Sequence, residues 1–203
     1  VYAIGLRQTI DPSNNAELAD KLLEARDKMR SRLDDANIAD FVEPFNSEKF
    51  NSNASVAENI LFGTPVGELF EVENLGNNEY VMGLLEKVGL RDEFIRKGQR
   101  LAEIMVDLFQ GLPADHEFWE KFSFIGPDDL PEFQAVLKRV AENGLEKLSE
   151  EDQSLLVELP FKLIPARHHL GLVDDEFEAR ILKARKEFSE NLPENLVASV
   201  EFF

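Results

Sequence analysis

The stretch SVAENILFG, Ser55 to Gly63, carries the signals that begin and end a helix within nine residues. Ser55 followed three positions later by Glu58 forms a capping box, in which each side chain accepts a hydrogen bond from the other residue's backbone N–H. Gly63 can adopt the left-handed conformation that ends helices, and Pro65 cannot continue one. We therefore expect a short helix from Ser55 to Phe62.

Similar signals recur along the chain and predict a mostly α protein, an irregular multi-helix bundle with one or two short β segments. Further helices are expected to begin near Asn14, Asn77 or Asn78, Asp92, Leu101, Asp128, Ser149 and Asp174 or Asp175. Apolar residues at spacings of three and four predict buried faces, as in Leu18, Leu22, Ala25, Met29 and Leu33 of the first helix. The two β-like segments are Ile38–Phe45 and Val197–Phe203.

Composition limits the possible partners. The 203 residues are 43% hydrophobic and 31% charged, which is typical of a folded globular protein. The net charge of −18 would repel nucleic acid and anionic lipid. It indicates either a solvated acidic surface or docking to a basic protein surface. The absence of cysteine excludes disulfides, thiolate catalysis and cysteine metal sites.

The sequence contains no run near the ~20 apolar residues that span a bilayer, so we expect no direct membrane insertion. The chain begins at Val1 and finishes on the apolar Val200–Phe203. From these ends we expect one helical domain, residues 1–203, excised from a longer polypeptide.

Two segments share a common order of elements. Residues 24–45 and 183–203 each run from a helix through an acidic break to a β-like segment that ends in Phe. Alignment pairs Ala25-Arg26 with Ala184-Arg185 and Val42-Glu43 with Val200-Glu201. We take this as a possible duplication.

The opening stretch resembles the segment that follows the Q-loop in ATP-binding cassette (ABC) exporters, where Glu-Asn-Ile is followed after one residue by Phe-Gly. Residues 84–95, LLEKVGLRDEFI, resemble a later helix of the same helical subdomain. The resemblance covers residues 45–96. It implies that residues 99–192 form a helical module inserted before the signature helix.

The chain also departs from that family. It has no G-x-x-x-x-G-K-[ST] loop to hold nucleotide phosphates, no Leu-Ser-Gly-Gly-Gln signature and no apolar strand ending in Asp-Glu. Glu43-Pro44 stands where the family has its Gln. The resemblance therefore implies that ATP and Mg are bound elsewhere in the parent chain, and that this piece has no cofactor and is not an enzyme by itself.

The resemblance implies a non-catalytic accessory or insertion domain of an ABC transporter ATP-binding protein, which modulates coupling or binds a partner. Its partners would be the rest of the ATPase chain and the transmembrane domain, at the cytoplasmic face of the cell membrane. The candidate contact residues are Ser55, Glu58, Asn59 and Phe62. The same residues are equally explained as a capped helix with one apolar face.

Two other readings stay open: a free-standing acidic helical protein-interaction domain, and a hydrolase that uses paired carboxylates. The adjacent His168 and His169 point in different directions on a regular element and are a poor metal chelate. The doublets Asp34-Asp35, Asp128-Asp129 and Asp174-Asp175 lie at predicted helix ends, where capping explains them. The aromatic stretch Phe118–Phe124 is expected to fill the core.

Overall fold

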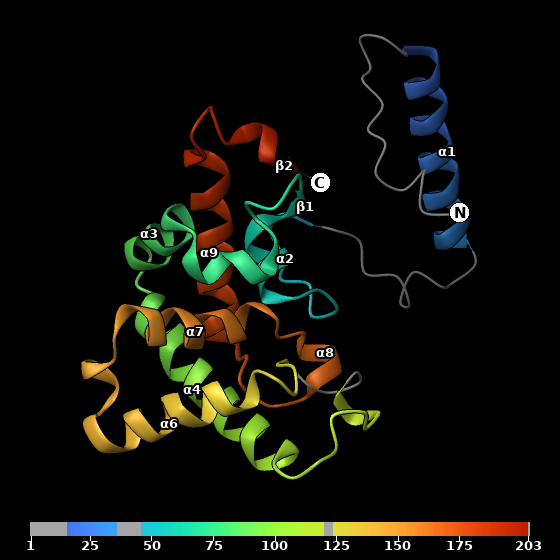
Figure 1. Cartoon of the computed structure of the whole chain (residues 1–203). Helices are drawn as coiled ribbons and strands as arrows, with labels where there is room; N and C mark the ends of the chain where they lie inside the picture. The colour runs from blue at the N-terminus through green and yellow to red at the C-terminus, as the bar shows by residue number, and fades with distance from the viewer. Residues whose placement is uncertain (1–15, 36–45, 120–123, 203) are drawn as a thin grey trace. The chain divides into compact units, whose positions relative to one another are not determined.

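The computed structural model of the chain describes residues 16–35, 46–119 and 124–202 (Figure 1). The contacts group the chain into two units, Val1–Pro44 and Phe45–Phe203, and each is described by itself. The predicted β segment Ile38–Phe45 and half of one copy of the possible duplication lie outside the described residues. The assignments of a single domain over 1–203, an exporter-like segment over 45–96 and an inserted module over 99–192 stay predictions.

In the first unit the described element is helix α1, Ala16–Asp35. The predicted burial of its apolar stripe is wrong, because Leu18, Leu22 and Met29 are 48%, 44% and 64% exposed. No second element is described within this unit against which the stripe could pack. The side chain of Leu33, the last residue of the stripe, lies outside the described part.

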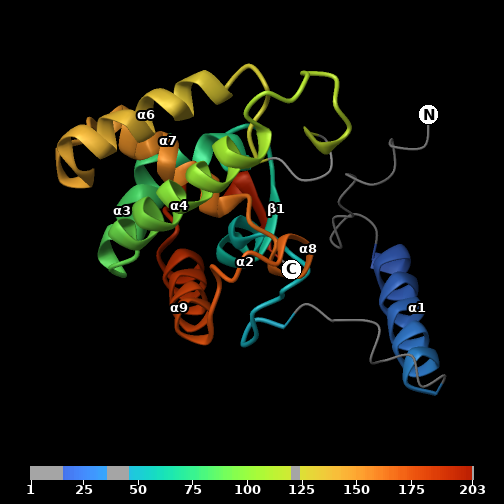
Figure 2. The same ribbon diagram turned by 90° about the horizontal axis from the view of Figure 1, so that it is seen from below.

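The second unit is mostly helical, with one two-stranded antiparallel sheet, as the sequence predicts (Figures 1 and 2). Its α-helices are α2 Val56–Leu61, α3 Glu79–Lys87, α4 Arg91–Phe109, α6 Leu130–Asn143, α7 Glu150–Phe161, α8 Pro165–His168 and α9 Asp175–Asn191. Its 3₁₀ turns are η3 Val72–Asn77, η4 Leu145–Lys147 and η5 Val197–Ser199, and its strands are β1 Gly63–Pro65 and β2 Val200–Phe202.

Four of the predicted helix starts are confirmed by side-chain caps. Ser55, Asn78, Ser149 and Asp174 each accept a hydrogen bond from a backbone N–H in the first turn of the following helix. The predicted Asp128 cap of α6 is wrong. That helix begins one residue later than expected, and its N-cap residue Asp129 instead accepts a hydrogen bond from the N–H of Gly126 at 3.2 Å.

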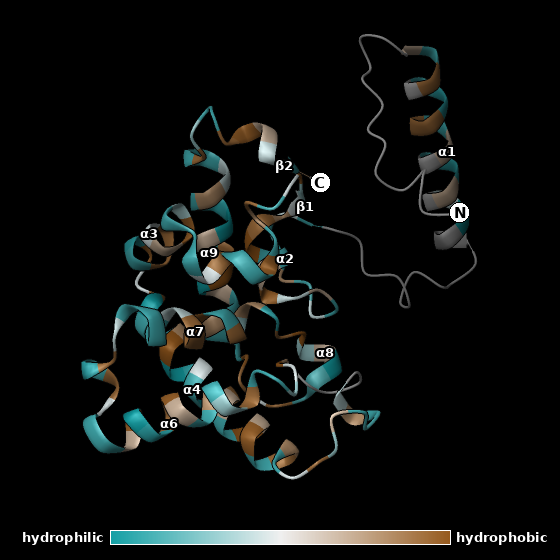
Figure 3. Cartoon of the chain, viewed as in Figure 1, coloured by the Kyte–Doolittle hydropathy of each residue, from teal (hydrophilic) through white to brown (hydrophobic). Residues whose placement is uncertain are grey.

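Helix α4 corrects a second prediction, since residues 92–96 and 101–108 form one continuous helix. The sequence predicted two separate helices here, and glycine is unfavourable in a helix interior. Here Gly98 allows a close crossing: a Cβ at this position would stand 1.9 Å from the carbonyl oxygen of Leu156 on α7. Helices α4 and α7 make the most extensive contact in the unit, and both carry hydrophobic segments there (Figure 3).

The core forms around α4, α7 and α9. The predicted stripe of α9 is confirmed, because Phe177, Ile181, Ala184 and Phe188 are fully buried. The Phe94 ring of α4 lies 4.9 Å from the Phe161 ring of α7 and 5.7 Å from the Phe177 ring.

The aromatic stretch enters this core only in part. Trp119 and Phe124 are buried and Phe118 is exposed, while Phe122 lies outside the described residues.

Helix α2 leads directly into the sheet. Phe62, rather than the expected Gly63, takes the left-handed conformation at its end, with φ of 45°. Gly63 begins β1, which pairs with β2 in the register Gly63 to Phe202 and Pro65 to Val200. In the described part of the chain, no helix is both long enough and apolar enough to cross a membrane.

Candidate functional site

The four sequence-predicted residues lie on α2 or at its ends: Glu58 and Asn59 are within the helix, Ser55 is its N-cap and Phe62 its C-cap. The capping box is complete: the Glu58 N–H donates to the Ser55 Oγ at 3.1 Å, and the Ser55 N–H donates to the Glu58 Oε2 at 2.7 Å. Ser55 is buried, while Glu58 is exposed. The carboxylate of Glu58 therefore fixes the start of α2 while remaining at the surface.

Asn59 follows on the buried side of α2 and uses both ends of its amide. Its Nδ2 donates to the carbonyl oxygens of Asn51 and Ser55, each at 2.9 Å. Its Oδ1 accepts from the Asn51 N–H at 2.8 Å and from Nη2 of Arg185 at 2.9 Å. The side chain thus holds the 46–54 loop against α2.

Arg185, on α9, is the centre of this network. Its Nε donates to the Asn59 carbonyl at 2.6 Å. Its Nη1 lies within 3.0 Å of the carbonyl oxygens of Asn46, Ser47 and Lys49. The guanidinium carbon lies 4.5 Å from the centre of the Phe62 ring, a cation–π distance.

The charge of Arg185 is unusual because it is buried, with 4% of the residue exposed. Among the described residues no carboxylate forms an ion pair with it, and backbone carbonyls surround it instead. Burial lowers the pKa of the guanidinium to about 10. The cation is therefore still present at neutral pH, and carbonyl dipoles take the place of a counter-ion.

The structure brings all four predicted residues together, but two of them are buried and two are accessible at the surface. Ser55 and Asn59 are buried and hydrogen-bonded within the unit, so they shape α2. Glu58 is exposed and Phe62 is half-buried beneath Arg185. Whether any of the four contacts a partner stays a prediction.

Sequence reasoning missed the role of Arg185. A signal was present, because Arg185 follows Ala184 within the buried stripe of α9, where an apolar residue is the norm. A charged residue at such a position requires hydrogen-bonding partners.

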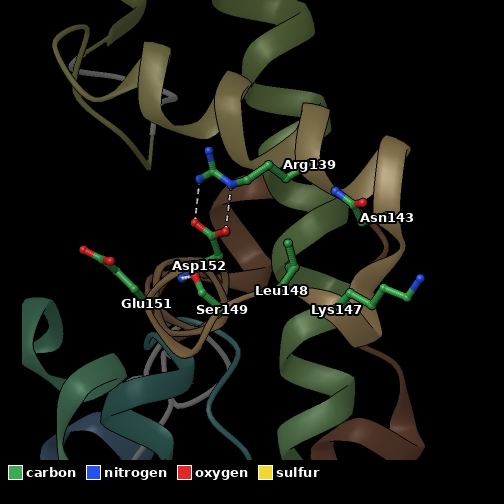
Figure 4. A pocket seen from close by; sticks show the side chains of 7 residues that line it. All are labelled: Arg139, Asn143, Lys147, Leu148, Ser149, Glu151 and Asp152. Carbon is green, nitrogen blue, oxygen red and sulfur yellow. Dashed lines mark hydrogen bonds and ion pairs between the residues drawn. The ribbon is translucent and has the colours of Figure 1, made fainter.

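A second polar site joins α6 and α7. Arg139 donates to Asp152 through two nitrogens, at 2.8 and 2.6 Å, beside a surface depression of about 370 Å³ (Figure 4). The pair holds the pKa of Asp152 below its usual range, first through the hydrogen bond from Arg139. This bidentate contact links α6 to the first turn of α7 and favours the charged forms of both groups.

The two adjacent histidines have different environments. His168 Nδ1 accepts a hydrogen bond from the Ile164 N–H at 2.9 Å, and its ring packs against Phe124 with centroids 4.3 Å apart. His169 takes the left-handed conformation after α8 and is exposed. Within the described ranges, no group of three His, Asp or Glu side chains is arranged to hold a metal ion.

No protein-family model, curated protein or solved structure matches this chain.

Proposed function

We propose that the chain is a non-catalytic helical accessory or insertion domain of an ABC transporter ATP-binding protein, which modulates coupling or binds a partner. The sequence resemblance of residues 45–96 supplies the family. One structural observation supports an accessory role: the two described ends of the second unit are both linked to α2, which carries the candidate contact residues.

The first end is the loop that begins at Asn46. Its carbonyl oxygens accept hydrogen bonds from Arg185, which also donates to Asn59 of α2. The second end is β2, in which Phe202 pairs with Gly63, two residues after the end of α2. Both segments are thereby tied to the helix beside Glu58 and Phe62.

In this proposal the partners are the rest of the ATPase chain and its transmembrane domain, at the cytoplasmic face of the membrane. ATP and Mg are bound by the parent chain. Glu58 and Phe62 are the contact residues on α2, while Ser55 and Asn59 hold that helix in shape. A displacement at either anchored end would act on α2 through Arg185 or through the β1–β2 pair.

The coding sequence on both sides of the chain tests the family assignment. A G-x-x-x-x-G-K-[ST] motif upstream and a Leu-Ser-Gly-Gly-Gln motif downstream support it. An initiator Met directly before Val1 together with a stop directly after Phe203 would overturn it.

The accessory role is tested in the parent protein by replacing the proposed inserted module, residues 99–192, with a short Gly-Ser linker. We expect ATP hydrolysis to persist and its stimulation by transport substrate to change. Loss of nucleotide binding would contradict a non-catalytic role. Within the intact parent, Glu58→Ala and Phe62→Ala should alter coupling, whereas Glu86→Ala, at an exposed site on α3, serves as the control.

A second candidate is a free-standing acidic helical protein-interaction domain. The observation that favours it is the exposed apolar stripe of α1, formed by Leu18, Leu22 and Met29. An amphipathic helix of this kind is a common docking element. The coding sequence on both sides of the chain, described above, distinguishes the two candidate functions.

A further inference from the structure

The outer edge of β2 carries backbone groups that face away from β1. The Val66 N–H donates to the Ser199 carbonyl at 2.8 Å, so residues 66 and 199 form a hydrogen-bonded pair. Antiparallel pairs alternate between bonded and non-bonded positions. In the observed register, Gly63–Phe202 and Pro65–Val200 are therefore non-bonded pairs.

This alternation directs the backbone of Val200 and Phe202 away from β1. The Val200 N–H is taken by the Val197 carbonyl. The outward groups are then the Val200 carbonyl and the N–H and carbonyl of Phe202. Among the described residues the sheet has two strands, so no third strand covers this edge.

Apolar side chains surround the same edge. Val197 and Phe202, which we call the sheet patch, are 47% and 42% exposed. Val197 begins the turn η5 directly before β2, and Phe202 is the last residue of β2. Apolar groups grouped beside an open strand edge are typical of a binding surface.

The charge around the sheet selects the partner. Residues 63–79 and 187–203, which form and flank the sheet, contain no Lys or Arg. They carry eight Glu residues, of which Glu187 forms an ion pair with Lys87 and Glu190 with Lys186; the other six are Glu68, Glu71, Glu73, Glu79, Glu194 and Glu201. A second copy of the chain would bring the same acidic residues and a further net charge of −18 to this edge. A basic segment is the complementary occupant.

We infer that the β2 edge binds an extended cationic segment of another protein by strand addition. The segment alternates apolar residues, which cover the sheet patch, with Lys or Arg, which face the acidic surroundings. Its backbone donates to the carbonyls of Val200 and Phe202 and accepts from the Phe202 N–H. This inference goes beyond the transporter assignment and does not depend on it, so its failure leaves the coding-sequence test unaffected.

The test measures binding of a fluorescein-labelled peptide, Gly-Lys-Val-Lys-Val-Lys-Gly with blocked ends, to the full chain by fluorescence anisotropy. A peptide with Glu in place of Lys is the charge control, and we expect it to bind at least about tenfold more weakly. Equal binding of the two peptides would overturn the charge argument and the proposal with it.

Two variants at one position isolate the backbone contact. Phe202→Ala and Phe202→Pro both lose the ring, but only proline also loses the outward N–H. We expect Phe202→Ala to weaken binding a few-fold and Phe202→Pro to weaken it by roughly a further tenfold. Leu108→Ala, at an exposed apolar site on α4, is the control and should leave the affinity unchanged.

Equal affinities for Phe202→Ala and Phe202→Pro would contradict strand addition. A dimer seen by sedimentation that Phe202→Pro converts to a monomer would also contradict the proposal, because the edge would then bind a second copy of the chain. Amide chemical shifts in the unmodified protein provide a measurement independent of variant folding. The Lys peptide should shift Phe202 and leave α4 unaffected, and the opposite pattern would contradict the inference.

Discussion

At the scale of single residues, Arg185 joins α9 to residues 46–62, which lie far from it in sequence. It contacts the 46–49 loop, α2 and the Phe62 ring from its place on α9. Arginine suits this position because its planar guanidinium presents donors in several fixed directions. Lysine has a single nitrogen and could not reach the same set of carbonyls.

We predict that Arg185→Met lowers the free energy of unfolding by about 2–4 kcal/mol, because it leaves buried carbonyls without donors. Arg185→Lys should cost nearly as much. Urea unfolding followed by circular dichroism measures both. Lys183→Met, an exposed neighbour on the same helix, should change stability by less than about 0.5 kcal/mol. A cost for Arg185→Met no larger than this would show that the network contributes little.

His168 gives the second residue-scale prediction, a dependence of stability on pH. Burial lowers the pKa of its imidazole below the ordinary 6.5, and the nearby Arg167 and His169 lower it further. The unfolded chain therefore binds the proton more tightly than the folded chain. Stability should be highest above pH 6.5 and fall as the pH drops through that value, by at most about 1.4 kcal/mol per pH unit.

The measurement compares urea unfolding at several pH values between 7.5 and 5.5. His168→Asn keeps an acceptor for the Ile164 N–H but does not titrate, so its stability should vary less with pH over this range. His169→Asn is the control and should keep most of the slope. An unchanged slope in His168→Asn would assign the pH dependence to other groups.

At the scale of elements, α4 and α7 cross closely because Gly98 has no side chain. A Cβ there would overlap the Leu156 carbonyl. Gly83, on α3, is also within a helix but has no neighbouring atom within 4 Å of a Cβ position. Substituting alanine at each of the two glycines therefore distinguishes the effect of helix propensity from the effect of packing.

We predict opposite effects for the same substitution at these positions. Gly98→Ala should destabilise the protein by about 1–3 kcal/mol, since the overlap outweighs the gain in helix propensity. Gly83→Ala should stabilise it by about 0.5–1 kcal/mol. Thermal unfolding of both variants is the measurement. Stabilisation by Gly98→Ala would show that the crossing can widen at little cost.

Local signals predicted much of the helical fold. The caps at Ser55, Asn78, Ser149 and Asp174 act within a few residues, so the sequence alone reveals them. The continuity of α4 could not be predicted, because it depends on packing against α7, about sixty residues away. Strand β1 was missed for the same reason, since Gly63–Pro65 has low β propensity and pairs only with β2. In the candidate site, α2 was predicted and its distant partner Arg185 was not.

At the scale of the whole molecule, the described core belongs to the second unit. All the buried apolar side chains in the described ranges lie between Phe50 and Val200. The single tryptophan, Trp119, is among them, so its fluorescence reports on this core.

We predict that residues 45–203 fold without residues 1–44. Their Trp119 emission and urea midpoint should match those of the full chain, with a difference in unfolding free energy below about 1 kcal/mol. Residues 1–44 produced alone provide the complementary sample. An unfolded or aggregated 45–203 fragment would show that the first unit is required for the fold.

The backbone carbonyls that surround Arg185 predict how the stability of the protein depends on ionic strength. Dissolved ions should raise the overall stability, because they screen the mutual repulsion within a net charge of −18. They cannot reach a guanidinium that is buried among carbonyl oxygens. The destabilisation caused by Arg185→Met should therefore be equal in dilute buffer and at high NaCl, so that the connection between α2 and α9 is independent of the acidic surface around it.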